Sequence, residues 1–507
     1  MNKKNTLINI CAALITFIVQ MIISLWLTPF VVSRLGEDAY GFINFANNFV
    51  AYASLLSVAL NSMASRYISI TYNTNNFLDA QKYFCSVLIA NSLLYGFLLI
   101  ISMFFIWKME IIINVPIEIL FQVKITFLLS FINMGTSLVG TVYTAAAFTT
   151  NKMHYASVVQ VLSNVVKCAI VFILFSYLPT KVYYLSIATL VAGLVTIVGN
   201  YKVTRILFPN FRFSLKLFDL HKIIILFKSG SWILISNISN LFLNGFDLLL
   251  SNLFISAAIM GRLSIAKQIP LALSSALGIL SNIFSSELTK EYAVNGDENI
   301  IASAKEQLKI LTFFFTVPYA GIIAVGPDFL RLWLKNARYS QDDLYNIYLL
   351  IIIILLDIIV STYMYSIHSI FIALDKVKIY SKILLVSSII SIIMTVVLLS
   401  ATKLGVFAIA GTSTVVLGIT HAVIVPALAA KTLNKSICLF WWSELKSWGV
   451  LICTVIIFNL ISKLLCFNSW IDFLCSVIIM AAVGYLLSIF LIFNSKELNV
   501  LKRVIFK

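Results

Sequence analysis

Apolar segments of about 20 residues follow one another along almost the whole chain, and this is the length that a helix needs to cross a bilayer. Of the 507 residues, 61% are hydrophobic and 11% are charged, whereas a soluble protein carries about 25% charged residues. No stretch between the segments is long enough for a soluble domain. Segments so long and so uniformly apolar favour helices over barrel strands. The sequence therefore predicts an all-α polytopic membrane protein.

The alternation of apolar runs and loops predicts about 14 transmembrane helices. Six precede a basic segment and eight follow it: 7–32, 42–64, 84–107, 119–147, 156–178, 183–204, then 232–253, 262–285, 310–330, 344–374, 383–401, 404–429, 448–466 and 470–493. We expect a six-helix lobe at 1–204, a cytoplasmic basic linker at 205–229 and a second six-helix lobe at 230–429. Two additional helices and a cytoplasmic tail would occupy 430–507.

The net charge of +16 does not indicate nucleic-acid binding, because the basic residues are spread over short loops between the spans. If alternate loops lie on alternate sides, the side of the N-terminus holds roughly 24 Lys and Arg and the other side roughly 10. Both termini are therefore expected in the cytoplasm. The seven Cys show neither metal nor disulfide spacing, and P-loop and HExxH motifs are absent. No cofactor or metal is expected.

Polar side chains recur at helical spacing inside several predicted spans. In the apolar run 232–254 they are Asn237, Asn240, Asn244 and Asp247. Hydrocarbon tolerates such groups only where they face protein or a water-filled cavity. Interhelical hydrogen bonds alone would also account for a single Ser, Thr or Asn, but stripes of several amides favour the lining of a central cavity. The amides assigned to that lining on other spans are Gln20, Asn47, Asn61 and Asn164.

Asp247 and Lys267 are expected at similar depths on the two helices of one hairpin. They could pair with each other and fix the helix register. Alternatively, Lys267 binds an anionic substrate and Asp247 positions it. Lys167 lies near the middle of the fifth span with no acidic residue nearby in sequence, which favours an inward-facing cationic site.

Three further ionisable residues are ambiguous in the sequence. Asp357, near the middle of its span, is a candidate for proton or cation coupling or for packing against Lys167. Arg66 is a topological anchor or an anion-attracting gate near the cytoplasmic mouth. His368 lies near the face that carries Asp357, and we group it with the coupling or ion-pair candidates.

Four short motifs are spread across most of the chain. They are Leu35-Gly36 with Tyr40-Gly41, the segment from Leu60 to Ile68 that contains Arg66, Asn244-Gly245-Phe246-Asp247 with Gly261, and Gly326-Pro327 with Leu332-Trp333-Leu334. These motifs resemble those of polysaccharide-transport proteins in the MATE-like (MOP exporter) flippase superfamily. Asn252 and Leu263 depart from the family pattern in the hairpin.

The resemblance is strongest to Wzx-type flippases and implies a MATE/MurJ-like fold, with two six-helix lobes around a central cavity. It implies alternating-access transfer of polyprenyl-diphosphate-linked oligosaccharides from the cytoplasmic to the outer leaflet. These would be O-antigen, capsule or exopolysaccharide precursors in a bacterial plasma (inner) membrane. Polysaccharide polymerase or assembly proteins are further candidate partners. The sequence cannot name the glycan.

Other functions remain open at this point. A lipid II-type flippase would share the same architecture. A MATE-type drug or cation exporter would require an acidic, aromatic cavity, whereas cations are at least as numerous as carboxylates in these spans. A membrane polymerase or glycosyltransferase would require a large outer loop or a nucleotide-sugar domain, and neither is visible. We therefore expect a transporter rather than an enzyme.

Overall fold

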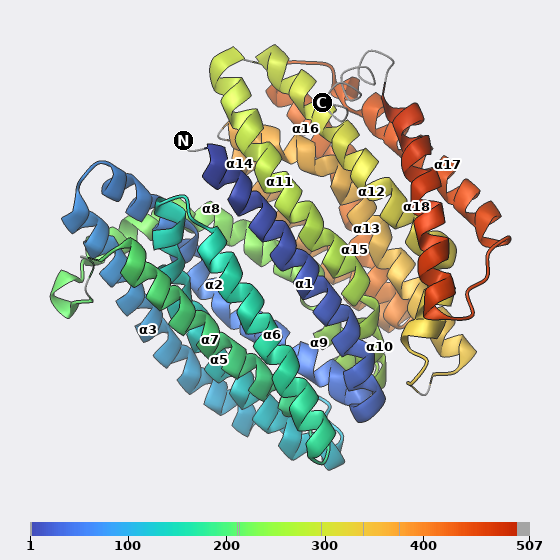
Figure 1. Ribbon diagram of the computed structural model, residues 1–507, viewed down its shortest axis with the longest axis horizontal. Coiled ribbons are helices and arrows are strands. Elements are labelled where there is room, and N and C mark those ends of the chain that lie inside the picture. Colours follow the sequence, from blue (N-terminus) through green and yellow to red (C-terminus); the bar gives the residue numbers. More distant parts are fainter. Residues whose placement is uncertain are drawn as a thin grey trace. The chain divides into compact units, whose positions relative to one another are not determined.

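The computed structural model describes residues 3–209, 211, 213–295, 297–337, 339–374 and 376–493, and within these ranges it contains helices and turns but no strand (Figure 1). Thirteen described helices are long and apolar enough to cross a membrane. The number rises to 14 if the bent pair Ala257–Ala266 and Gln268–Leu280 forms one span. The predicted all-α fold of about 14 spans is therefore confirmed.

Contacts divide the chain into two compact units, Met1–Ile265 (unit 1) and Ala266–Lys507 (unit 2). Figure 1 shows the long helices of unit 1 running side by side. The helices of unit 1 are α1 (Lys3–Leu35), α2 (Glu37–Asn73), α3 (Phe77–Trp107), α4 (Met109–Ile112), η1 (Ile117–Ile119), α5 (Leu120–Thr149), α6 (His154–Tyr177), α7 (Tyr184–Leu207), η2 (Leu215–Leu217), α8 (Leu220–Asn244), α9 (Asp247–Phe254) and α10 (Ala257–Ala266), which ends at the boundary.

Unit 2 holds the remaining helices, several of which are interrupted or contain proline. Pro318 and Pro327 lie inside α12, and a π-helical turn separates α15 from α16. The bounds are α11 (Gln268–Asn295), α12 (Asp297–Trp333), α13 (Gln341–Ala373), α14 (Val377–Ala401), α15 (Val406–Ile419), η3 (Thr420–Ile424), α16 (Val425–Thr432), η4 (Ile437–Leu439), α17 (Trp441–Ser462) and α18 (Trp470–Ile492).

Much of the segment predicted as a linker at 205–229 is helical. The helix α8 begins at Leu220, where the Asp219 side chain accepts a hydrogen bond from the backbone N–H of His221. It then packs closely on α2, since a Cβ at Gly230 would lie 2.0 Å from the carbonyl oxygen of Ala59. These contacts place α8 in unit 1. The division into lobes at 205–229 stays a prediction about the two halves of the sequence.

The seventh and eighth predicted spans each contain a break that the sequence did not predict. The seventh ends as α8 at Asn244 and resumes as α9 at Asp247. The eighth begins at Ala257, earlier than predicted, and is interrupted at Lys267. Neighbouring side chains satisfy the freed backbone groups at the first break, as described below, and this is what a break inside a membrane requires.

Small amide or hydroxyl side chains cap the beginnings of α3, α13 and α18. Ser340 caps α13 and Ser469 caps α18, each in a capping box with the aspartate three residues later. Each such box satisfies two backbone N–H groups that would otherwise lack partners. Large apolar side chains such as Ile100, Phe104 and Phe490 remain exposed, as expected of surfaces that face lipid.

Candidate functional site: polar residues within the membrane helices

The helix α6 carries a polar stripe formed by Gln160, Asn164 and Lys167. The Gln160 amide donates to Asn164 Oδ1 at 3.4 Å, and Asn164 Nδ2 is buried without a hydrogen-bond partner. Lys167, one turn further on, is half-buried and makes no hydrogen bond or ion pair with any residue of the described part of the chain. An ammonium group at this depth needs an anion, a polar partner or water. The stripe therefore offers hydrogen-bond donors, on Asn164 and Lys167, that no described residue accepts from.

The helix α1 runs parallel to α6 and brings Gln20 to the level of this stripe. Thr16 donates to the carbonyl oxygen of Ser157 at 3.3 Å, and Arg34 donates to that of Phe175 at 3.0 Å. Both contacts join residues that are 141 positions apart, so the register is constant along the pair. On that register Gln20 lies beside the turn that holds Gln160 and Asn164, and its side chain is exposed.

The candidate residues of α2 lie in three different surroundings. Asn47 is exposed. Asn61 accepts a hydrogen bond of 2.8 Å from Asn91 of α3, whose amide also donates to the carbonyl oxygen of Leu138 in α5. Arg66 is exposed about two turns before the end of α2, because that helix extends beyond the predicted end at Ala64. Asn61 therefore links helices, whereas Asn47 and Arg66 remain accessible.

The break between α8 and α9 is stabilised by the aromatic and amide groups of α2. The carbonyl oxygen of Gly245 accepts hydrogen bonds from the Tyr52 hydroxyl and, at 3.3 Å, from Asn48 Nδ2. The rings of Tyr52 and Phe246 stack with centroids 5.3 Å apart. Asp247, which is 7% exposed, begins α9, where the positive end of the helix dipole favours a carboxylate.

The break changes the predicted stripe on this span. Asp247 belongs to a separate helix from Asn237 and Asn240, so the four residues do not form one continuous helical face. Asn240 is exposed, Asn237 donates back to the carbonyl oxygen of Ile233, and the side chain of Asn244 lies outside the described residues. Sequence reasoning missed Asn48 and Tyr52. The signal that could have found them is the carbonyl oxygen of Gly245, which needs hydrogen-bond donors where the helix breaks.

The helix α10 packs on α2 through small residues and a charged pair. Arg262 Nε lies 3.1 Å from Glu37 Oε2, and Asn44 Nδ2 donates to Ser264 Oγ at 2.6 Å. Gly41 and Gly261 permit this approach, because a Cβ at Gly41 would lie 2.8 Å from Gly261 Cα. Immediately after α10, Lys267 occupies the break before α11 and is 7% exposed. A cation after the last turn of α10 complements its negative dipole end.

Unit 2 gathers polar groups around α13. Ser361 shares a hydrogen bond of 3.0 Å with Nδ1 of His421, and the ring of His368 lies 4.2 Å from that of Tyr380 between centroids. His421 lies in the π-helical turn η3, an irregularity that often accompanies function. Asp357 lies one turn before Ser361 on α13 and is half-buried. Sequence reasoning selected Asp357 and His368 but missed His421, which stands in an apolar run without a polar stripe.

The predicted site residues thus fall into two groups. Gln20, Asn164 and Lys167 come together on the pair α1 and α6 of unit 1, and Asp357 and His368 lie on α13 of unit 2. Lys267 is buried at a helix break, and its pairing with Asp247 stays a prediction, as does a role for any of these residues in binding.

Comparison with known proteins supplies a family and a fold. The profile of the family described as "Polysaccharide biosynthesis protein" matches residues 3–285. The uncharacterized membrane protein EpsK of Bacillus subtilis (strain 168) is 25% identical over 428 residues, covering 84% of this chain and 83% of EpsK.

Two solved structures show the same architecture. The lipid II flippase MurJ in an inward closed conformation superposes with a TM-score of 0.70 at 15% identity, covering 98% of this chain and 99% of MurJ. An inward-facing multidrug resistance MATE family transporter of the MOP superfamily gives a TM-score of 0.65 at 14% identity, covering 86% of this chain and 99% of the transporter. The predicted MATE/MurJ-like fold is confirmed.

Proposed function

The chain belongs to the polysaccharide biosynthesis protein family, and from this premise we propose that it is a flippase for lipid-linked oligosaccharide repeat units. The observation that carries the proposal is Lys167, a half-buried cation on a membrane-spanning helix that has no anionic partner among the described residues. A charge inside a membrane protein is costly without a partner, and such residues commonly mark substrate pathways. A phosphate-bearing substrate would supply the missing anion.

A polyprenyl-diphosphate-linked oligosaccharide matches the chemistry of the stripe on α6. The ammonium group of Lys167 attracts the diphosphate, and charge-assisted hydrogen bonds of this kind are stronger than neutral ones. Gln20 and Asn164 offer amide donors and acceptors to the sugar hydroxyls. We include Arg66, Lys267, Asn47, Asn61, Asn240 and Asn244 as further contacts along the path, and Asp247, Asp357 and His368 as residues that pair or couple.

The charge distribution supports a topology, and the resemblance to Wzx-type flippases implies the direction of transport. The basic excess in alternate loops indicates that both termini are cytoplasmic, with the protein in the bacterial plasma membrane. The substrate would then be taken from the cytoplasmic leaflet and released in the outer leaflet by alternating access. Broken helices such as α8–α9 and α10–α11 are a common feature of transporter sites. The glycan would be an O-antigen, capsule or exopolysaccharide precursor, handed on to polymerase or assembly proteins.

The test is to replace Lys167 with Gln in a strain whose surface glycan depends on this protein. We expect a drop of roughly tenfold in surface glycan, because losing about 1.4 kcal/mol of substrate stabilisation corresponds to that factor. Lys167→Arg should restore part of the display, since the charge returns. Surface glycan is measured together with the amount of protein inserted in the membrane.

Lys152→Gln is the matched control, because Lys152 lies in the loop just before α6, outside the apolar segment. It should leave display unchanged. Normal display by Lys167→Gln at wild-type protein levels would remove the charge-based mechanism.

Two related transport functions differ from our proposal in the substrate that the protein would carry. The likeness to MurJ favours a lipid II-type precursor as the alternative cargo, and the likeness to the MATE transporter favours a drug or cation. Complementation of a strain depleted of its lipid II flippase tests the first. Drug sensitivity of a deletion strain tests the second, and resistance conferred by this chain without any effect on glycan would replace our proposal.

A further inference from the structure

A lysine-rich cavity lies among α12, α17 and α18 of unit 2, away from the polar stripes described above. Its volume is about 280 Å³. Three lysines line it, Lys305 and Lys309 of α12 and Lys446 of α17, and no carboxylate of the described residues does. We propose that this cavity binds the phosphate group of an anionic membrane lipid. The proposal does not rest on the transported substrate.

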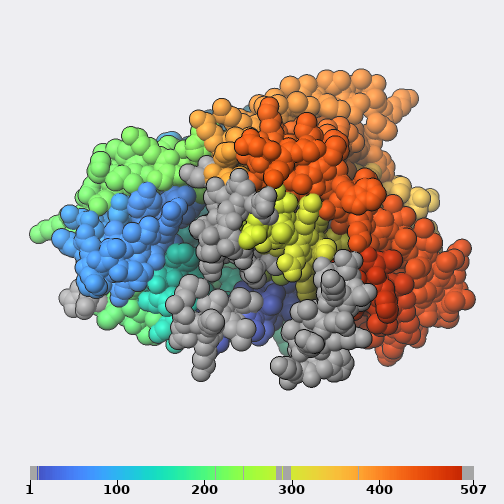
Figure 2. Space-filling model, turned by 90° about the horizontal axis from the view of Figure 1, so that it is seen from above, coloured from blue at the N-terminus to red at the C-terminus, as the bar shows by residue number. Residues whose placement is uncertain are grey.

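The ends of three helices place the cavity at one edge of the membrane. Lys305 and Lys309 lie in the first third of α12, Lys446 lies in the second turn of α17, and Ile492 is the last residue of α18. With an alternating topology these three ends share the side that the basic loops make cytoplasmic. Figure 2 shows part of this end of unit 2, with the yellow atoms of α12 beside the orange-red atoms of α17.

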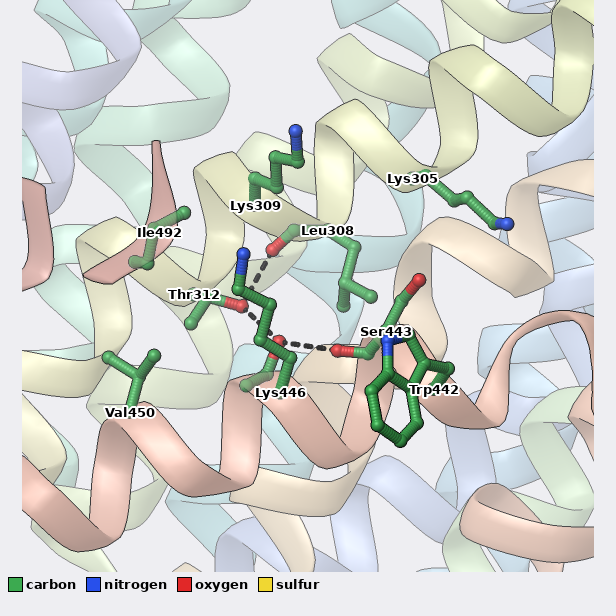
Figure 3. Close-up of a pocket in the computed structure, with 10 residues that line it drawn as sticks. Lys305, Leu308, Lys309, Thr312, Trp442, Ser443, Lys446, Val450 and Ile492 are labelled. Atoms are coloured by element: carbon green, nitrogen blue, oxygen red, sulfur yellow. Dashed lines mark hydrogen bonds between the residues drawn. The ribbon is translucent and has the colours of Figure 1, made fainter. Parts of the chain in front are cut away.

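The side chains of the cavity are arranged to hold an anion. In Figure 3, Lys309 and Lys446 reach in the same direction from their two helices. Beneath them the hydroxyls of Thr312 and Ser447 share a hydrogen bond of 2.8 Å, which fixes α12 against α17. Lys305 and Lys446 bring ammonium groups to the cavity from two different helices, and a phosphate group accepts charge-assisted hydrogen bonds from such groups.

Two features favour a lipid over a free anion. Val450 and Ile492 form an apolar part of the cavity wall, and both lie on membrane-spanning helices. Trp442 is 80% exposed at the cavity, and tryptophan concentrates at the level of lipid headgroups. A ligand with a phosphate at one end and a hydrocarbon chain at the other fits both features. Basic pockets between helices on the cytoplasmic side are a known mode of anionic-lipid recognition.

Two acidic residues of the described part of the chain lie close in sequence to the cavity lysines. Glu306 follows Lys305 and is exposed, and Glu444 is 6% exposed, but neither lines the cavity. Among the described residues, the side chains that line the cavity are therefore basic, polar or apolar.

The experiment is native mass spectrometry of the purified full-length protein with phosphatidylglycerol, phosphatidylcholine, a polyprenyl diphosphate and inorganic pyrophosphate as separate probes. The pocket variant combines Lys305→Gln with Lys446→Gln. The control variant combines Lys382→Gln with Lys431→Gln, two exposed lysines outside the cavity. We expect the pocket variant to retain phosphatidylglycerol roughly thirtyfold more weakly than the wild type, since each of the two lysines contributes about 1 kcal/mol to anionic-lipid binding and about 1.4 kcal/mol corresponds to a factor of ten.

The control variant should bind phosphatidylglycerol as the wild type does, and phosphatidylcholine should bind weakly to all three proteins. Stronger retention of the polyprenyl diphosphate than of phosphatidylglycerol, lost in the pocket variant, would support the site and assign it to that lipid. Equal lipid retention by the wild type and a folded pocket variant would overturn the proposal. Binding of pyrophosphate without binding of either lipid would also overturn it.

Discussion

Asparagine side chains hold neighbouring helices of unit 1 together at positions where the surrounding residues are apolar. Asn252 and Asn114 form a reciprocal pair, in which each amide donates to the backbone carbonyl of the other residue at 3.0 to 3.1 Å. Asn252 Oδ1 also accepts from the backbone N–H of Asn114 at 3.0 Å. Asn252 is fully buried, so α9 is tied to the segment between α4 and η1.

Replacing Asn252 with Ala should destabilise the fold. The backbone N–H and C=O of Asn114 would lose their partners, and an unsatisfied buried group costs about 1–3 kcal/mol. Hydrogen bonds between membrane helices average about 0.6 kcal/mol each, so losing the two bonds of the Asn252 side chain should cost roughly 1 kcal/mol. The measurement is the midpoint of thermal unfolding in detergent.

Asn240→Ala is the matched control for Asn252→Ala, because Asn240 is exposed on α8. Its unfolding midpoint should equal that of the wild type. If Asn252→Ala also unfolded at the wild-type midpoint, the reciprocal pair would not be holding α9 in place.

At the level of elements, the contact between α2 and α10 depends on glycine. A Cβ at Gly261 would lie 2.2 Å from the carbonyl oxygen of Glu37, and a backbone oxygen cannot swing away as a side chain can. The ion pair between Glu37 and Arg262 lies in the same contact. Close approach of helices through small residues is the usual way that membrane helices associate.

We therefore expect Gly261→Ala to destabilise unit 1 by roughly 1–3 kcal/mol, the range for overpacking. Gly96→Ala on α3 is the control, because a Cβ there meets nothing within 4 Å. The readout is the yield of monodisperse protein together with the unfolding midpoint. Equal yields and midpoints for the two variants would contradict the proposed tight contact.

Hydrophobic length and turn residues were enough to predict most spans. The predicted helix 156–178 is α6 (His154–Tyr177), and 470–493 is α18 (Trp470–Ile492). The breaks at Gly245 and Lys267 were not predictable, because the first depends on donors from Tyr52 and Asn48, about 200 residues away in sequence. Periodicity along one helix carries no information about such partners.

The polar stripes were predicted with mixed success for the same reason. Asn164 and Lys167 lie together on α6, the helix that corresponds to the fifth predicted span. Spacing could not show that Asn61 accepts a hydrogen bond from Asn91 of α3, nor that His421 shares a hydrogen bond with Ser361 of α13. Sequence spacing gives the face of a helix, but the partner of that face comes from packing between elements that are distant in the chain.

For the whole molecule, the account rests on movement of a lipid-linked oligosaccharide across the bilayer. The family, the MurJ-like fold and the Lys167 stripe support that function together. Transport can be separated from synthesis by reconstituting the purified protein into liposomes that carry a polyprenyl-diphosphate-linked oligosaccharide with a fluorescent label on the sugar. A membrane-impermeant quencher then reports which leaflet holds the sugar.

This leaflet assay tests the central claim most directly. We predict that the protein exchanges labelled sugar between the leaflets faster than protein-free liposomes do, and that Lys167→Gln slows the exchange roughly tenfold while Lys152→Gln does not. Exchange at the protein-free rate by correctly folded wild-type protein, with the repeat unit of its own host as substrate, would contradict the flippase assignment.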